Sequence, residues 1–149
     1  MSGYSLRPCT AGDEAFARRL HREAYEDVVT RQFGCWDEAR QRSLFDAKWD
    51  PARFQVVVAN SRTVGLLAIE RRADEVFVHE IQLLPVAQGR GIGRGLMEEV
   101  QSVAAAAGLP VRLRVLRLNR ARSLYERLGF CVYDETDTHF LMEWLPVKA

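Results

Sequence analysis

The eight residues Gln-Gly-Arg-Gly-Ile-Gly-Arg-Gly at 88–95 constrain the fold of this chain more than any other stretch. They follow an apolar run that ends at Pro85 and precede a helical pattern that continues to Ala107. Glycines at alternate positions let the backbone turn tightly and approach a ligand closely. The first N–H groups of a helix lack intrahelical partners, and the helix dipole favours negative charge there. The stretch therefore predicts a strand, a loop and a helix that bind an anion, with a pyrophosphate as the expected group and Arg90 and Arg94 as cations beside it.

The two common nucleotide-binding loops do not fit this stretch. A dinucleotide fingerprint needs Gly-x-Gly-x-x-Gly, but its last position is Arg94 when counted from Gly89 and Leu96 when counted from Gly91. The acidic residue that would bind a ribose is absent from the next apolar run, residues 111–116. A triphosphate-binding loop requires Gly-Lys-Ser or Gly-Lys-Thr, and the stretch contains no lysine. Both classes of nucleotide site are therefore disfavoured.

Two segments instead resemble the GNAT superfamily, the acyl-coenzyme A-dependent N-acyltransferases. Residues 88–93, Gln-Gly-Arg-Gly-Ile-Gly, are similar to the Gln/Arg-x-x-Gly-x-Gly/Ala signature of that superfamily. Residues 119–130, Asn-Arg-Ala-Arg-Ser-Leu-Tyr-Glu-Arg-Leu-Gly-Phe, are similar to its Asn-x-x-Ala-x-x-Leu-Tyr-Glu-x-Leu-Gly-Phe segment. The two segments occur in the family's order, separated by a helix and a strand, and the element order agrees with the family from about Tyr4 to Trp144.

The resemblance implies an α/β fold with a mixed sheet, in the order β-α-α-β-β-β-α-β-α-β-β. The sheet is expected to splay between its fourth and fifth strands, with the cofactor in the gap. Local patterns predict the individual elements. The expected strands are at 4–8, 54–59, 63–70, 76–84 and 111–116, with final strands around Cys131 and Phe140 and a hairpin turn across 60–62. The expected helices follow the N-cap Thr10, span 36–49, run from the glycine stretch to Ala107 and span 119–128. The last two of these helices are expected to end at Gly108 and Gly129.

Composition sets the expected class of protein. A chain of 149 residues with 48% hydrophobic content can bury one core, so we expect a single acyl-CoA N-acyltransferase domain over residues 1–149. The absence of an apolar leader and of a long uncharged stretch predicts a cytoplasmic protein without a membrane partner. Cys9, Cys35 and Cys131 are odd in number and form no Cys-x-x-Cys pair, which predicts reduced thiols and no bound metal.

The charge of the chain is low overall but uneven. A net charge of +1 argues against nucleic-acid binding. Residues 90–127 contain eight arginines and three glutamates, so this segment carries +5 and the rest of the chain −4. Such a run is either a solvated basic face or a field that steers a cofactor with three phosphate groups to the glycine stretch.

The resemblance implies acetyl-CoA as the co-substrate and assigns its binding residues. A backbone N–H near Leu83 or Leu84, freed where the strand diverges from its neighbour, would polarise the thioester carbonyl. The Asn119 side chain would cap the following helix and also lie near the pantetheine arm. The expected binding residues are Leu83, Leu84, Gln88, Gly89, Arg90, Gly91, Ile92, Gly93, Arg94, Asn119 and Tyr125.

Acyl transfer from a thioester to an amine requires an unprotonated amine, a polarised carbonyl and an acid for the leaving thiolate. Tyr125 occupies the family's tyrosine position, and a phenol with a pKa near 10 can donate a proton at pH 7. The alternative for Tyr125 is a core position, since Ala121, Leu124 and Leu128 share its helical face.

The expected general base is Glu80, which shares a nominal strand face with Gln82 and falls where many members of the family carry a carboxylate. A surface or structural glutamate is the alternative. The substitutes for the base are the chain's three histidines, His21, His79 and His139.

The expected function is therefore an N-acetyltransferase that works by direct transfer in a ternary complex. The acceptor stays open between a small metabolite, an antibiotic-like amine and a protein N-terminus, and a homodimer is one option for assembly. Two other classes remain: a non-catalytic acyl-CoA sensor or interaction module on the same fold, and a nucleotide-binding regulatory domain.

Overall fold

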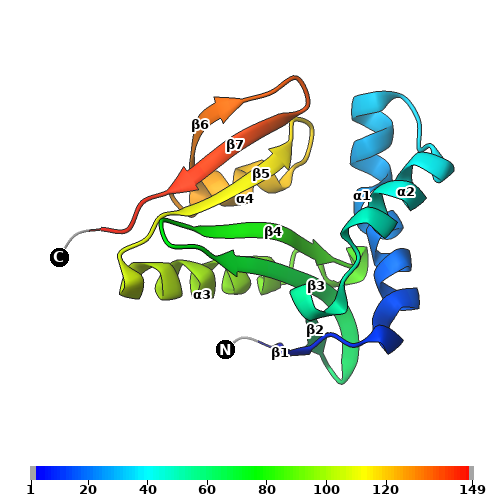
Figure 1. Ribbon diagram of the computed structural model, residues 1–149, viewed down its shortest axis with the longest axis horizontal. Coiled ribbons are helices and arrows are strands. Elements are labelled where there is room, and N and C mark those ends of the chain that lie inside the picture. Colours follow the sequence, from blue (N-terminus) through cyan, green and yellow to red (C-terminus); the bar gives the residue numbers. More distant parts are fainter. Residues whose placement is uncertain (1–2, 148–149) are drawn as a thin grey trace.

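The computed structural model describes residues 3–147, which form a seven-stranded mixed sheet flanked by helices (Figure 1). The strands are β1 (Ser5–Pro8), β2 (Gln55–Ala59), β3 (Arg62–Arg71), β4 (Val76–Leu83), β5 (Val111–Leu116), β6 (Cys131–Glu135) and β7 (His139–Trp144). The helices are α1 (Glu14–Phe33), α2 (Glu38–Lys48), α3 (Ile92–Ala107) and α4 (Ala121–Arg127), with short 3-10 helices η1 (Ala11–Asp13), η2 (Pro51–Arg53) and η3 (Pro85–Ala87). This order confirms the expected α/β mixed-sheet fold.

The sheet consists of two halves that meet at one parallel pair of strands. Its order is β1-β2-β3-β4-β5-β7-β6, and every neighbouring pair except β4 and β5 is antiparallel. β4 and β5 pair only through Val76–Val78 and Val111–Leu113. Beyond these residues the two strands diverge toward their C-terminal ends (Figure 1). The expected splay is confirmed, and we call β1 to β4 the first half of the sheet and β5 to β7 the second half.

Local signals set most of the element ends. The hairpin between β2 and β3 turns at Asn60 and Ser61, whose φ angles of 52° and 62° are those of a two-residue turn with both residues left-handed. Gly108 ends α3 in the left-handed region, as expected. The Asp37 carboxylate accepts a hydrogen bond from the Arg40 N–H and caps α2, so this helix begins at Glu38 and the expected start at residue 36 was wrong.

The core lies on both faces of the sheet. On one face, Met97 and Val100 of α3 pack against the buried side chains of β4 and β5. On the other face, Leu20 of α1 packs against Val56 and Leu66 of β2 and β3. Within residues 3–147 no helix is long and apolar enough to cross a membrane. The two helical layers leave the diverging ends of β4 and β5 between them.

Candidate active site

The loop between β4 and α3 presents backbone donors at a helix N-terminus. Gly89 and Gly91 have φ angles of 74° and 83°, a region that strains a residue with a side chain, and Gly91 is the N-cap of α3. The first intrahelical bond runs from the Gly95 N–H to the Gly91 carbonyl, and no side chain caps the helix. The N–H groups of residues 92–94 therefore precede the first helical bond, which is the arrangement that binds anions.

The four glycines of this stretch do not have one role. A Cβ on Gly93 would lie 3.6 Å from Leu124 and 3.8 Å from Leu83, which are ordinary contacts. A Cβ on Gly95 would lie 3.1 Å from the ring of Tyr4, so this glycine makes room for a packed tyrosine. The expectation that all four glycines open the backbone to a ligand is therefore wrong for Gly95. The Ile92 side chain is buried and anchors the helix start, while Arg90 and Arg94 are exposed.

The end of β4 distinguishes the two candidate amides for the thioester carbonyl. The Leu84 N–H donates to the Val64 carbonyl at 2.8 Å, so of the two expected amides this one is already paired within the sheet. Gly65 lies opposite Leu83, and backbone groups in an antiparallel ladder alternate in direction, so the Leu83 N–H points away from β3 toward the splay. The Leu83 carbonyl points the same way and accepts a hydrogen bond of 3.0 Å from the Gln88 side chain. Gln88 thus fixes the loop to the strand end.

A β-bulge turns Glu80 toward α1. Ala68 pairs with Glu80 and Ile69 with Val78, which leaves His79 as an extra residue in β4. Regular alternation would place Glu80 on the face of Val78, which packs in the cluster that contains α3. Instead the Glu80 carboxylate reaches the opposite face and shares it with Gln82, as the sequence predicted.

Two side chains orient the Glu80 carboxylate. The Tyr25 hydroxyl donates to Oε2 at 3.1 Å, and the Gln82 side-chain amide donates to the same oxygen at 3.0 Å. Gln82 is only 6% exposed. Burial raises the pKa of Tyr25 well above its usual value, and the charge of Glu80 adds to this effect. Tyr25 therefore keeps its proton and serves as a donor. The sequence did not single out Tyr25, because no local motif marks it.

Tyr125 is a core residue whose ionisation is influenced by this carboxylate. It belongs to α4 and is 6% exposed, and its ring centroid lies 5.9 Å from that of Phe130. Burial raises the pKa of Tyr125, and the negative charge of Glu80 raises it further. The phenol is thus neutral and carries a proton through the physiological range. The two readings of Tyr125, core and acid, are compatible.

Asn119 caps α4. Its Oδ1 accepts a hydrogen bond of 2.9 Å from the Ala121 N–H. Helix α4 begins at Ala121, so the expected start at Asn119 was wrong. The family segment places its asparagine three residues before the alanine, whereas Asn119 stands two residues before Ala121. The resemblance therefore matches from Ala121 onward, and the capping role is the one that the contacts support.

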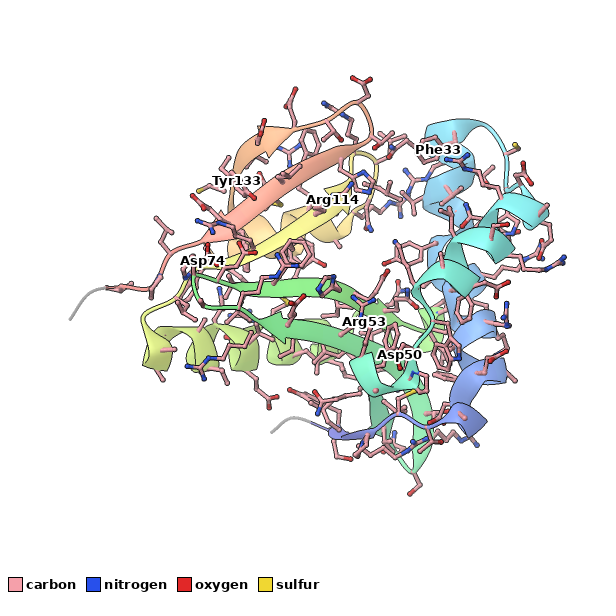
Figure 2. The ribbon with its side chains drawn as sticks, viewed as in Figure 1. Phe33, Asp50, Arg53, Asp74, Arg114 and Tyr133 are labelled. Atoms are coloured by element: carbon pink, nitrogen blue, oxygen red, sulfur yellow. The ribbon has the colours of Figure 1, made fainter. Side chains whose placement is uncertain are left out.

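The three histidines lie in different surroundings. His21 Nε2 lies 3.0 Å from the Gln41 side-chain oxygen, and the His21 ring contacts Tyr25. His79 Nε2 lies 2.8 Å from a Glu70 oxygen. Burial lowers the pKa of His139, and the cations Arg114 and Lys48 lower it further. Figure 2 shows Arg114 on β5 in the second half of the sheet. Of the three histidines, His21 is the one that lines a pocket together with Glu80.

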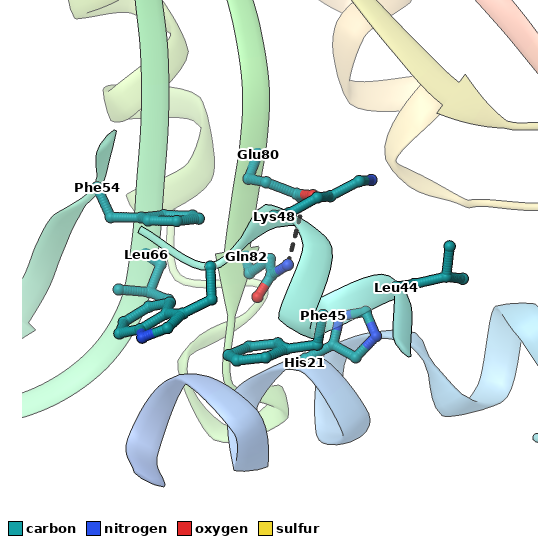
Figure 3. A pocket seen from close by; sticks show the side chains of 9 residues that line it. His21, Leu44, Phe45, Lys48, Phe54, Leu66, Glu80 and Gln82 are labelled. Carbon is teal, nitrogen blue, oxygen red and sulfur yellow. Dashed lines mark hydrogen bonds between the residues drawn. The ribbon is translucent and has the colours of Figure 1, made fainter. Parts of the chain in front are cut away.

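That pocket has a volume of about 80 Å³ and lies between α1, α2 and the strands β3 and β4 (Figure 3). Glu80 and Gln82 of β4 lie on one side of it, and the polar groups of His21 and Lys48 also line it. Phe45, Trp49 and Phe54 form a stacked column with ring separations of 5.5 and 5.6 Å. The remaining lining residues are His21, Leu44, Lys48 and Leu66. An apolar wall beside one carboxylate suits an amine with an apolar neighbour.

Metal ligation finds no support among the described residues. Between residues 3 and 147, His, Cys, Asp and Glu side chains form no group of three or more that could hold a metal ion. Cys9 is buried, whereas Cys35 and Cys131 are exposed, and all three are free thiols.

Known proteins are similar to this chain in sequence and in fold. A model of the acetyltransferase (GNAT) domain matches residues 50–132. Mycothiol acetyltransferase of Streptomyces scabiei is 34% identical over 111 residues, which are 69% of this chain and 36% of that protein. The chain thus spans about a third of the length of this relative.

Two solved structures illustrate the shared fold. PaiA N-acetyltransferase from Thermoplasma acidophilum, in complex with coenzyme A, has a TM-score of 0.78 at 21% identity and covers 95% of this chain and 98% of its own. The ribosomal-protein-S18-alanine N-acetyltransferase from Escherichia coli has a TM-score of 0.68 at 21% identity and covers 98% of this chain and 96% of its own. Since the domain match spans more than half of its residues, this chain belongs to the GNAT family of acetyltransferases.

Proposed function

We propose that this chain is an N-acetyltransferase that moves an acetyl group from acetyl-CoA to a primary amine within a ternary complex. The observation that carries the proposal is the position of the Glu80 carboxylate. It is held by Tyr25, acts electrostatically on the Tyr125 phenol, and lies on the strand that leads into the glycine loop. The chain, residues 1–149, is proposed to act as one catalytic domain in the cytoplasm and without a metal.

The acetyl-CoA site is proposed at the splay. The backbone donors of residues 92–94 suit the pyrophosphate, with Arg90 and Arg94 beside them. The Leu83 N–H, directed toward the splay, is the proposed donor to the thioester carbonyl. The structural relative that holds coenzyme A supports this choice of ligand, since it shares the fold over almost the whole chain.

The proposed reaction uses Glu80 and Tyr125 on opposite sides of the transferred group. The amine nitrogen attacks the carbonyl carbon, the carbon–sulfur bond breaks, and the thiolate leaves with the electron pair. The Glu80 carboxylate takes the amine proton through water; its Oε2 already accepts two hydrogen bonds, which leaves Oε1 as the acceptor. The Tyr125 hydroxyl donates a proton to the thiolate. Tyr25 and Gln82 keep the carboxylate in place.

The acceptor is proposed to place its amine at Glu80 and its neighbouring apolar group against Phe45 and Trp49. The pocket has a volume of about 80 Å³, which gives room for a compact apolar group beside the amine. The names of the two relatives describe acetylation of a small molecule in one and of a protein alanine in the other. The acceptor class is accordingly either a small-molecule amine or a protein amine.

Two measurements on the purified protein test the proposal. The first is the melting temperature with acetyl-CoA, NAD or ATP, and we expect the largest increase with acetyl-CoA. The second is thiol release from acetyl-CoA with a panel of primary amines, from short alkyl amines and amino-acid amides to peptides with small N-terminal residues. Stabilisation by acetyl-CoA without thiol release for any amine would support a sensor instead. Equal stabilisation by NAD would contradict the assigned ligand.

A further inference from the structure

The two halves of the sheet diverge at their open end, where no pairing between β4 and β5 joins them. Glu80 belongs to the first half, whereas Asn119 and Tyr125 follow β5 in the second half. The strands that join the halves pair through three residues on each side, all at the closed end. The distance between the proposed base and the proposed acid is therefore set by contacts outside the strand ladder.

Helix α1 makes such contacts at its C-terminal end. The Gln32 side-chain amide donates to the Thr138 carbonyl at 2.8 Å, and the Leu118 N–H donates to the Gln32 side-chain oxygen at 3.0 Å. The Thr138 carbonyl also accepts a hydrogen bond from the Arg117 N–H at 3.1 Å. Gln32 thus joins α1 to the β6–β7 turn and to the segment between β5 and α4. The end of α1, marked by Phe33 in Figure 2, lies near that turn in Figure 1.

The same helix is fixed to the first half of the sheet. Tyr25 bonds to Glu80, and Leu20 packs against Val56. Tyr25 and Gln32 are seven residues apart, which is about two helical turns or about 10 Å along one face of the helix. A single rigid helix therefore holds Glu80 at one position and the second half of the sheet at the other.

The segment that Gln32 holds leads directly into α4. Leu118 precedes Asn119, whose side chain caps α4 through the Ala121 N–H, and Tyr125 follows one turn later. We infer that Gln32 is a positioning residue, which sets the spacing across the splay so that the acid on α4 faces the base on β4. This inference rests on the proposed function, but its structural part can be measured without activity.

The chain offers a matched control. The Gln101 side-chain amide donates to the Leu128 carbonyl at 2.9 Å, so it also joins a helix to a backbone carbonyl. This bond connects α3, which packs against both β4 and β5, with the C-terminal end of α4, and it does not touch the segment between β5 and α4. Loss of either glutamine removes a side-chain-to-backbone contact, but only Gln32 joins α1 to the segment before α4, so we expect only its loss to change the spacing between the two halves.

The experiment compares Gln32→Ala, Gln32→Glu and Gln101→Ala with the unchanged protein. We expect Gln32→Ala to speed hydrogen exchange at the Leu118 amide by about 10-fold or more and to lower kcat by about 10- to 100-fold, with little change in the KM for acetyl-CoA. Gln32→Glu keeps an acceptor for the Leu118 N–H but cannot donate to Thr138, so its kcat should fall between the two. Gln101→Ala should leave Leu118 exchange and kcat within about 2-fold of the unchanged protein.

Each outcome decides the inference. An unchanged kcat in Gln32→Ala with a fast-exchanging Leu118 amide would overturn it, and so would an equal fall of kcat in Gln101→Ala. If Gln32→Ala does not fold, the comparison of Gln32→Glu with Gln101→Ala decides by the same criteria. If the unchanged protein acetylates no amine, the proposed function fails. The structural role of Gln32 is then tested by hydrogen exchange at the Leu118 amide alone, and slow exchange in Gln32→Ala would disprove it.

Discussion

Tyr25 of α1 and Glu80 of β4 share a hydrogen bond of 3.1 Å although 55 residues separate them in the sequence. The bond directs the carboxylate into a pocket whose walls include the stacked rings of Phe45, Trp49 and Phe54. Gln82 supplies a second donor to the same oxygen. Together the two bonds explain how a glutamate on a half-buried strand can be oriented for proton transfer.

The Tyr25–Glu80 bond predicts a moderate rate effect for Tyr25→Phe. The variant keeps the ring but removes one of the two donors to the Glu80 carboxylate. A hydrogen bond to a charged group contributes about 1.5 to 3 kcal/mol, so we expect kcat/KM for the amine to fall by about 10- to 100-fold. Steady-state kinetics on Tyr133→Phe, which loses a half-exposed hydroxyl on β6, provide the control and should match the unchanged protein. Equal activity of both variants would show that the bond does not serve catalysis.

Glu80→Gln should lower the rate mainly below neutral pH. The amide retains an oxygen that can accept from Tyr25, so the pocket keeps its shape, but it cannot take a proton. Amines with a pKa near 10 are mostly protonated at pH 7, and general-base assistance contributes about 10²- to 10⁴-fold. The loss should shrink at high pH, where free amine is abundant. A pH–rate profile unchanged in shape and height would remove Glu80 from the mechanism and favour His21, which lines the same pocket.

Tyr125→Phe should show whether the Tyr125 hydroxyl acts as a general acid or only stabilises the core. Its ring still packs against Phe130, so melting temperature and acetyl-CoA affinity should change little. Loss of a general acid predicts a fall in kcat of about 10- to 1,000-fold without a comparable change in KM. The measurement is steady-state kinetics together with a melting curve. A destabilised variant with normal turnover per folded molecule would assign the hydroxyl to the core alone.

The raised pKa of Tyr125 predicts how the stability of the fold changes at alkaline pH. Its folded pKa lies above the unfolded value near 10, so its contribution to stability is complete below about pH 10 and is lost as pH rises further. We therefore expect the melting temperature to fall less between about pH 9 and pH 11 in Tyr125→Phe than in the unchanged protein. Parallel curves for the two proteins would contradict the burial of this hydroxyl.

Gly91→Val should abolish the stabilisation by acetyl-CoA. At 100 times its dissociation constant, a ligand stabilises the folded state by about 2.7 kcal/mol, which raises the melting temperature by several degrees. A Cβ at Gly91 would contact nothing within 4 Å, but the φ of 83° strains a β-branched residue and a side chain would cover the loop amides. Gly108→Val is the matched control, because Gly108 also has a positive φ and an open surrounding at the far end of α3. It should lose stability but keep the acetyl-CoA shift.

Much of the fold followed from local sequence. The left-handed glycines at Gly91 and Gly108 delimit α3 because few other residues tolerate that backbone, and the Asn60–Ser61 turn follows from similar preferences. The order of elements was predictable because helical and strand periodicities are encoded within each segment. The candidate acid Tyr125 was found through its motif, which lies within one helix.

The arrangement around the reacting groups required the tertiary structure. The bulge at His79 turns Glu80 to the face of α1, and the ladder register assigns the open amide to Leu83 and not to Leu84. Tyr25 and Gln32 act on partners 55 and 106 residues away, and neither carries a local signal. Such contacts depend on strand register and on how a helix crosses the sheet. Those features are fixed by packing between distant segments, which no pattern within one segment records.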